Sequence, residues 1–505
     1  CVIFFFQSCY KEAIIFDGEP NNFLEPNLIL KINNKDCAFD SKSNTLRYSI
    51  EYDCIGDFEA FIEFQSYSKI YFRDSLLINN HMNNLGAIEV NKDYEISVIT
   101  NGIEHDMILQ FTNLPIIQVL THNTIIDEPK KLARLIINYP SLSEDVLTSY
   151  IGIEHKGKAS QWNEKKSFLF SFLNSQRTDD RVSKSIFGLK ENSDWWLDAM
   201  SADHARLRNK TSFEIWQQIE NTKNYGIHSN FVELFINSEH QGLYCLNEQM
   251  NSQLLDMFFD DALLYKAVAW DGTTFAVYEE TVSTNKYWNN WEQKFPQPTS
   301  RINWDPLMYL TNLVVNYEDD TFIEEISKLI NIDNFIDYYI FINMLSAADN
   351  TGKNTFLARK SQEDPLFIIP WDLEGSFGRF WNGDAVGYQD IQSNSLYGRL
   401  FELNPNNFKT RLQNRWFELR TNILSPDNLI TIFETNFNQL GCGYGQFGDR
   451  VIYSAPNVPT TYSYCFNSCN NSCPSGDVNV TFVLDAASYT SPIDSVNIFG
   501  TFNYV

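Results

Sequence analysis

Residues 348–355, with the sequence ADNTGKNT, place a run of polar side chains directly after the apolar segment Phe335–Leu345. The spacing of apolar residues in that segment predicts a helix. Further along, the apolar run LFIIP at 366–370 predicts a strand, and the polar turn WDLEG at 371–375 follows it. A helix that leads into a polar loop, and a strand that leads into a polar turn, bring both polar stretches to one edge of a cleft.

Three oxygen-bearing side chains in these stretches suit phosphoryl transfer. Asn354 lies five positions after Asp349, and Asp372 lies 23 positions after it (372 − 349 = 23). One Asp can take the proton of an attacking hydroxyl, while an Asn and a second Asp hold Mg²⁺ or Mn²⁺. A D-x4-N pair alone also fits a turn at a helix end. The position of Asp372 just after a predicted apolar strand favours the catalytic interpretation. In that interpretation Asp349 is the catalytic base, and Asn354 and Asp372 are metal ligands.

Composition excludes several classes of protein. The 505 residues include 38 basic and 64 acidic side chains, a net charge of −26. An acidic chain repels the phosphates of nucleic acids, so we expect no nucleic-acid partner. A hydrophobic content of 43% excludes disorder over most of the length. Charged residues interrupt every apolar run of about 18 residues, which excludes a protein with several membrane spans.

The pattern along the chain predicts an α+β protein of several domains. Alternating apolar residues predict a small β-sandwich within residues 10–114. Strand patterns followed by helix patterns over 115–440 predict a two-lobed domain with a cleft between its lobes. Residues 441–477 have the composition of a linker and contain cysteines. Residues 478–505 open a further strand module, which resembles the first strands of starch-binding-like β-sandwiches.

Several motifs in chain order resemble those of the CotH kinase family, the spore-coat-protein-H-like atypical protein kinases. The resemblance covers roughly residues 114–440. It implies a bilobal protein-kinase-like fold that transfers the γ-phosphoryl group of ATP to Ser or Thr of a surface or secreted protein. The matching motifs are HKGKAS (155–160), KKSF (165–168), WWLDA (195–199), D-x4-RN (203–209), HQGLY with Glu248 (240–248), the two polar stretches above, RLF (399–401) and RW (415–416).

The resemblance also assigns residues to the nucleotide. Either Lys165 or Lys166 would be the strand lysine that faces the phosphates, because strand alternation puts only one of them in the cleft; the family pattern favours Lys165. Glu214 would pair with that lysine or lie on a solvated helix face. Glu248 would contact the nucleotide or form a structural salt bridge. The glycine turn would contribute Gly157 and Ser160. Lys156 departs from the pattern, since the family often has Arg there.

The start of the chain resembles a bacterial lipoprotein signal. The apolar run Val2–Phe6 is followed by Ser8 and Cys9, the residue that would receive the lipid. Residues 1–9 would then be the remnant of the signal, and the protein would be exported and lipid-anchored at the bacterial cell envelope or surface. A buried N-terminal strand is the alternative. In an exported protein the late cysteines Cys442, Cys465, Cys469 and Cys473 favour disulfides, with free thiols or a metal site as alternatives.

Two functions therefore remain for the chain. The first is an atypical Ser/Thr protein kinase with ATP as substrate, and the retained Asp349, Asn354 and Asp372 favour it. The second is a non-catalytic surface scaffold that binds glycan or protein. Export favours the scaffold, because free ATP is scarce outside the cytoplasm.

Overall fold

The computed structural model describes residues 14–15, 30–51, 57–141, 146–157, 163–175, 180–203, 205–219, 225–380, 382, 384 and 391–443. For residues 14–15 and 441–443 only the backbone is described. Several predicted features lie outside these residues: Cys9, Ser160, the side chain of Cys442, Cys465, Cys469, Cys473, most of the linker and the strand module at 478–505.

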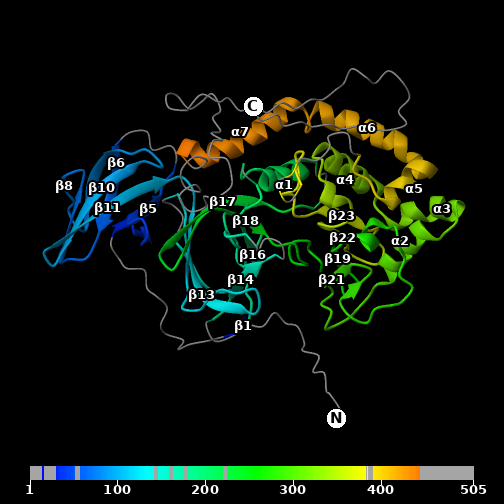
Figure 1. The fold of residues 1–505 in the computed structure, drawn as a ribbon, viewed down its shortest axis with the longest axis horizontal. Helices are drawn as coiled ribbons and strands as arrows, with labels where there is room; N and C mark the ends of the chain where they lie inside the picture. The colour runs from blue at the N-terminus through cyan, green and yellow to red at the C-terminus, as the bar shows by residue number, and fades with distance from the viewer. Residues whose placement is uncertain are drawn as a thin grey trace, which may run out of the picture.

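Two antiparallel-rich sheets form a module at the N-terminal end of the described chain (Figure 1). Both sheets contribute to one hydrophobic core, as the alternation in β6 illustrates, where Phe58, Ala60 and Ile62 are buried. The four-stranded sheet has the order β3 (Lys35–Asp36), β2 (Lys31–Ile32), β6 (Asp57–Glu63), β9 (His81–Ala87). The six-stranded sheet has the order β4 (Ala38–Asp40), β5 (Thr45–Ser49), β11 (Ile103–Thr112), β10 (Asp93–Thr100), β7 (Ser68–Phe72), β8 (Ser75–Leu76).

The next strands close into a barrel. The sheet order is β13 (Lys130–Asn138), β12 (Ile116–Leu120), β17 (Ser229–Ile236), β18 (Glu239–Glu248), β16 (Asp194–Asp198), β15 (Ser167–Leu173), β14 (Leu147–Lys156). β14 pairs back onto β13, and β1 (Ile14–Ile15) adds to β13 in parallel. Inward-facing side chains such as Phe170, Trp195 and Val232 fill the interior. Because residues alternate along each strand, their neighbours in sequence lie on the outer face.

The rest of the chain is mainly helical. It surrounds a five-stranded sheet with the order β20 (Tyr287–Trp288), β21 (Trp291–Phe295), β19 (Leu263–Ala267), β22 (Thr355–Arg359), β23 (Phe367–Pro370). The helices are α1 (Arg208–Ile219), α2 (Asp305–Val315), α3 (Asp319–Leu329), α4 (Ile332–Met344), α5 (Ser395–Leu403), α6 (Phe408–Thr421) and α7 (Pro426–Gly443). The predicted α+β class is thereby confirmed.

One hydrophobic core joins the barrel to this helical part. Trp196 on the outer face of β16, Phe213 of α1 and Trp371 after β23 belong to it. The rings of Trp196 and Trp371 lie 5.2 Å apart between centroids. The barrel and the helical part therefore meet at Trp371, directly beside Asp372.

The two-sheet module is fixed to the barrel by buried polar contacts. The Nη1 atom of Arg47 in β5 lies 3.1 Å from the Oε2 atom of Glu233 in β17, and the Nε2 atom of His240 lies 3.0 Å from the same oxygen. Glu233 and His240 are both buried. Asp40 accepts a hydrogen bond from the backbone N–H of His240 at 3.1 Å.

Helix α7 runs from the helical part to the two-sheet module (Figure 1). It lies beside α1 and extends to the two-sheet module, the orange helix in Figure 1. There the side-chain amide of Asn113 donates to the backbone oxygen of Gln439 at 2.9 Å. None of the helices in the described part of the chain has an apolar stretch long enough to cross a bilayer.

Candidate functional site

Asp349 lies in a short 3-10 helix, Ala348–Thr351, just after α4. Its carboxylate is buried, and its Oδ2 atom lies 3.4 Å from the Nζ atom of Lys353. Burial raises the pKa of Asp349; the Lys353 charge opposes this shift, and the nearby charge of Asp372 adds to it. The carboxylate is therefore a stronger proton acceptor than an exposed Asp.

The loop after Asp349 needs a glycine for close packing. A Cβ atom at Gly352 would lie 2.4 Å from the Cε3 atom of Trp270 and 2.7 Å from the side chain of Thr274. The next residue, Lys353, lies above the Trp270 ring, with its Nζ atom 5.8 Å from the ring centroid. The glycine thus lets the loop approach Trp270 and sets where Lys353 meets Asp349.

Asn350 connects the two polar stretches. Its side-chain amide donates to the backbone oxygens of Asn354 at 2.7 Å and of Trp371 at 3.0 Å. The Tyr338 hydroxyl of α4 donates to the backbone oxygen of Asn350 at 2.7 Å. The backbone N–H of Trp371 donates to the backbone oxygen of Asn354 at 2.9 Å. The sequence pattern does not identify Asn350 as a positioning residue, because an Asn inside a polar loop carries no signal of its own.

Asn354 and Asp372 lie together, as the sequence predicted. The side-chain N–H of Asn354 donates to the backbone oxygen of Asp372 at 3.4 Å. Both residues have left-handed backbone angles, with φ of 55° and 53°. Asn and Asp adopt such angles more readily than other non-glycine residues, because their short polar side chains can form local hydrogen bonds. The structure therefore brings Asp349, Asn354 and Asp372 to one place, while their chemical roles stay predictions.

The barrel adds a further carboxyl to this place, Asp198 at the end of β16. Its Oδ1 atom accepts a hydrogen bond from the backbone N–H of Met200 at 2.9 Å. Its Oδ2 atom accepts one from the side chain of Asn209 in α1 at 2.8 Å. The Oδ1 atom of Asn209 in turn accepts a hydrogen bond from the backbone N–H of Leu373 at 3.0 Å. Asn209 therefore ties the barrel to the turn that carries Asp372.

Helix α1 begins at Arg208, five positions after Asp203. Asp203 caps the helix, because its Oδ2 atom accepts a hydrogen bond from the backbone N–H of Arg208 at 2.7 Å. Its Oδ1 atom lies 3.1 Å from the Nε atom of the same Arg208. The motif D-x4-RN is thus a helix cap followed by a bridging Asn.

Glu374 completes a group of acidic side chains. Burial raises its pKa well above the usual range, and the charges of Asp198 and Asp372 raise it further. Hydrogen bonding with the Asp198 carboxyl also raises the pKa of Glu374. Burial likewise raises the pKa of Asp198.

Lys156, at the end of β14, faces these carboxyls. Its Nζ atom lies 3.3 Å from the Trp196 ring centroid and 4.6 Å from the Trp371 ring centroid. Burial lowers the pKa of Lys156 well below its usual range, and the charge of Lys266 in β19 lowers it further. The Asp372, Asp198 and Glu374 carboxylates oppose that shift.

The two lysines predicted to face the nucleotide make other contacts. The Nζ atom of Lys165 donates to the backbone oxygen of Leu243 and lies 4.6 Å from the Tyr244 ring centroid. The Nζ atom of Lys166 donates to the backbone oxygen of Asn163 at 2.6 Å. These contacts place both side chains at the end of the barrel wall.

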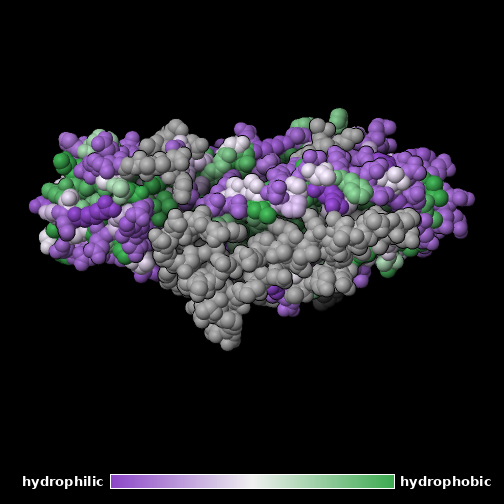
Figure 2. All heavy atoms as spheres, turned by 90° about the horizontal axis from the view of Figure 1, so that it is seen from above, coloured by the Kyte–Doolittle hydropathy of each residue, from purple (hydrophilic) through white to green (hydrophobic). Residues whose placement is uncertain are grey.

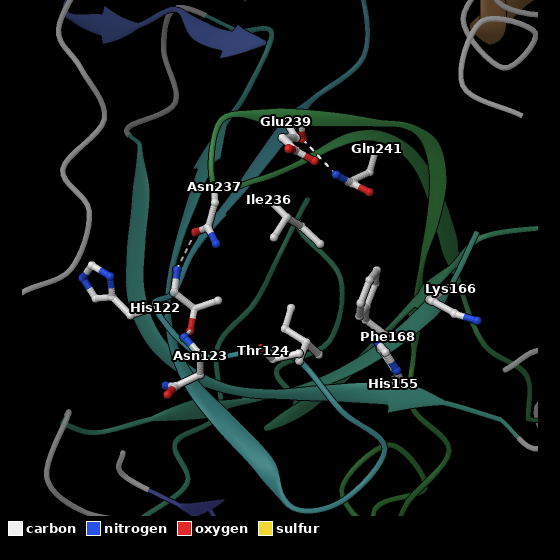
Figure 3. Close-up of a pocket in the computed structure, with 12 residues that line it drawn as sticks. His122, Asn123, Thr124, His155, Lys166, Phe168, Ile236, Asn237, Glu239 and Gln241 are labelled. Carbon is white, nitrogen blue, oxygen red and sulfur yellow. Dashed lines mark hydrogen bonds between the residues drawn. The ribbon is translucent and has the colours of Figure 1, made fainter. Parts of the chain in front are cut away.

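Lys166 also lines an open pocket of about 500 Å³ at the mouth of the barrel (Figure 3). Ile236 and Phe168 lie toward its middle, and Glu239 and Gln241 lie along one side. His155 lines the same pocket, whereas the next residue, Lys156, lies against Trp196 on the outer face. The pocket and the acidic side chains near Lys156 are thus on opposite sides of the barrel wall.

The remaining predicted nucleotide residues have structural partners. Glu214 contacts Lys210 on its own helix and Asn436 of α7. Glu248 is buried, and its Oε2 atom accepts hydrogen bonds from the backbone N–H and the ring of His228 at 2.8 and 3.0 Å. Gly157 is exposed with a φ of 94°, as a tight glycine turn requires.

The donor atoms near Asp372 fit a hard divalent cation. Among the described residues, no group of three or more His, Cys, Asp and Glu side chains is arranged to hold a metal ion. Mg²⁺ does not need such a cage, since it binds to one or two carboxylates and completes its shell with water and phosphate oxygens. Asp372 and Asn354 would supply a carboxylate and an amide oxygen, with the acidic surroundings favouring a cation.

Comparison with known proteins agrees with this geometry. Residues 153–441, more than half of the chain, match the family described as CotH kinase protein. Inner spore coat protein H of Bacillus subtilis (strain 168) is 23% identical over 306 residues, which cover 58% of this chain and 77% of that protein. The matched region contains Asp198, Asp349, Asn354 and Asp372. The chain therefore belongs to the CotH kinase family.

Proposed function

We propose that this protein is an atypical protein kinase that transfers the γ-phosphoryl group of ATP to a Ser or Thr hydroxyl of a surface or secreted protein. The observation that carries the proposal is the convergence of Asp349, Asn354 and Asp372 beside the junction of barrel and helical part. The barrel and the helical part would be the two lobes, and the nucleotide would lie between them.

Asp349 would act as the catalytic base. The substrate hydroxyl oxygen forms a bond to the γ-phosphorus, the bond from that phosphorus to the ADP oxygen breaks, and the hydroxyl proton passes to Asp349. A base is most effective when its pKa lies close to the working pH, and burial raises the pKa of Asp349 in that direction. Lys353, 3.4 Å away, holds the carboxylate in place.

Asn354 and Asp372 would hold Mg²⁺ or Mn²⁺. The bound cation supplies positive charge against the phosphates during transfer. Asn350 keeps the two ligand-bearing stretches together through its hydrogen bonds to the backbone of Asn354 and Trp371. Its role would be positioning, since its side-chain amide donates to backbone oxygens on both stretches.

The test is nucleotide binding and phosphoryl transfer with labelled ATP and either cation. Asp372→Ala should lose cation-dependent ATP binding, because the cation loses its carboxylate ligand. Asp349→Ala should retain binding and lose transfer. Wild-type protein that neither binds nor transfers with Mg²⁺ or Mn²⁺ would rule out the kinase.

In that event the second candidate, a scaffold that binds protein or glycan, takes its place. One observation favours it, a group of exposed apolar side chains on the two-sheet module. Figure 2 shows hydrophobic residues at that end of a largely hydrophilic surface. Exposed large side chains there include Tyr67, Leu76, Ile78, Met82 and Ile103.

A further inference from the structure

Two lysines from different sheets converge on one tryptophan ring. Lys156 ends β14 of the barrel, and Lys266 lies in β19 of the five-stranded sheet. Their Nζ atoms lie 4.6 and 5.9 Å from the centroid of Trp371. The two ammonium groups are close enough that the charge of Lys266 lowers the pKa of Lys156. Repulsion between like charges is costly, so their convergence indicates a place that receives an anion.

Carboxyl groups lie close to Lys156. Asp372, Asp198 and Glu374 are the acids whose charges act on Lys156. A site for a metal–nucleotide complex needs both signs of charge, since carboxylates hold the cation and lysines contact the phosphates. Lys156 is also fixed in direction, because its Nζ atom lies 3.3 Å from the Trp196 ring centroid and 3.4 Å from the Oε1 atom of Gln249.

We propose that Lys156 and Lys266 bind the phosphate chain of a nucleoside triphosphate, the role that the sequence pattern gives to Lys165 or Lys166. The inference rests on the proposed kinase function and adds the residues that contact its nucleotide. Lys156 comes from the barrel and Lys266 from the helical part. The phosphates would therefore bridge the two parts next to Asp372.

The contacts of the other two lysines support this assignment. Lys165 is buried and donates to the backbone of Leu243 in the barrel wall. Lys166 donates to Asn163 and lines the pocket at the barrel mouth, where Figure 3 shows its side chain directed away from the middle of the pocket. Both would have to leave these positions to reach phosphates beside Asp372.

The experiment compares ATP with adenosine, because only ATP carries phosphates. Equilibrium binding of each to the full chain would be measured with Mg²⁺ for wild type and for Lys156→Gln, Lys266→Gln, Lys165→Gln and Lys166→Gln. Lys69→Gln, at an exposed lysine of the two-sheet module, is the matched control. Thermal unfolding of each variant shows whether it is folded.

We expect Lys156→Gln and Lys266→Gln each to raise the Kd for ATP by roughly tenfold or more, the loss typical of a hydrogen bond between charged groups. The Kd for adenosine should change less than about twofold. Lys156→Arg should restore ATP binding, since Arg also binds phosphate. The affinity of wild type for ATP should fall with salt, and less steeply in the two Gln variants.

Two results would overturn the inference alone. In the first, wild type binds ATP but both Gln variants bind it equally well, or only Lys165→Gln or Lys166→Gln weakens binding. In the second, ATP and adenosine weaken together in folded Lys156→Gln, which would mean that Lys156 only shapes the Trp196–Trp371 contact. Absence of ATP binding in wild type would instead remove the proposed function, and this inference with it.

Discussion

Asn209 is the side chain whose removal should most directly separate the barrel from the turn that carries Asp372. It is 2% exposed, donates to Asp198 at 2.8 Å and accepts from the backbone N–H of Leu373 at 3.0 Å. In Asn209→Ala the buried N–H of Leu373 is left without this acceptor, at a cost of about 1–3 kcal/mol. Loss of the bond to the Asp198 carboxyl adds about 1.5–3 kcal/mol. The expected loss of stability is therefore roughly 2.5–6 kcal/mol.

Urea unfolding followed by tryptophan fluorescence measures this loss. The matched control is Asn422→Ala, which removes an exposed hydrogen bond to the backbone of Glu418 and should cost less than about 0.5 kcal/mol. A double-mutant cycle with Asp198→Ala isolates the bond between the two side chains, and we expect a coupling of about 1–3 kcal/mol. A loss no larger than that of the control, or a coupling below about 0.5 kcal/mol, would refute the bridging role.

Three further outcomes are expected. Asp349→Ala should lower the transfer rate by about 10²–10⁴ while leaving the Kd for ATP near that of wild type; a twofold loss in single-turnover transfer would exclude it as the base. Burial alone would raise the pKa of Glu233, but Arg47 and the hydrogen bond from His240 lower it to about 2. The stability that ionised Glu233 contributes is fully present above about pH 4.5 and is lost as the pH falls toward 2. Urea unfolding should therefore show about 3 kcal/mol less stability at the acid end of this range than above pH 4.5. The Glu233→Gln variant should lack that pH dependence. A chain extended upstream to include a whole signal should partition into detergent, and its Cys9→Ala variant should not; equal partitioning into water would contradict the lipid anchor.

Local patterns were sufficient to predict the three polar residues at the centre of the site. Asp349 follows helix α4 within a few residues, Asn354 directly precedes β22, and Asp372 follows β23 after Trp371, so their places depend on short stretches of chain. The α+β class was predictable for the same reason, since alternation and helical spacing are read over about ten residues. Closure of the barrel was not, because β12 pairs with β17 more than 100 positions later.

The lysines show where the pattern is insufficient. Strand alternation predicts that Lys165 and Lys166 lie on different faces, but β15 begins only at Ser167, and alternation does not say which face meets the helical part. That choice depends on the pairing of β14 with β15, which sets Lys156 opposite Ser167. It also depends on Trp371, which contacts Lys156 only in the folded chain. The sequence pattern does not assign Asp198 and Glu374 to the site for the same reason, since only the folded chain brings them close to Asp372.

The contacts of the two-sheet module have a consequence for cutting the chain. A shorter protein that starts after Thr112 would lose Arg47 and Asp40 while retaining Glu233 and His240. The carboxylate of Glu233 would then lie on an exposed barrel surface without its guanidinium partner. If the shorter protein started after Asn113 instead, the end of α7 would also lose the hydrogen bond from Asn113 to Gln439. Expression of residues 115–440 alone should therefore give a less stable product than a chain that includes the two-sheet module.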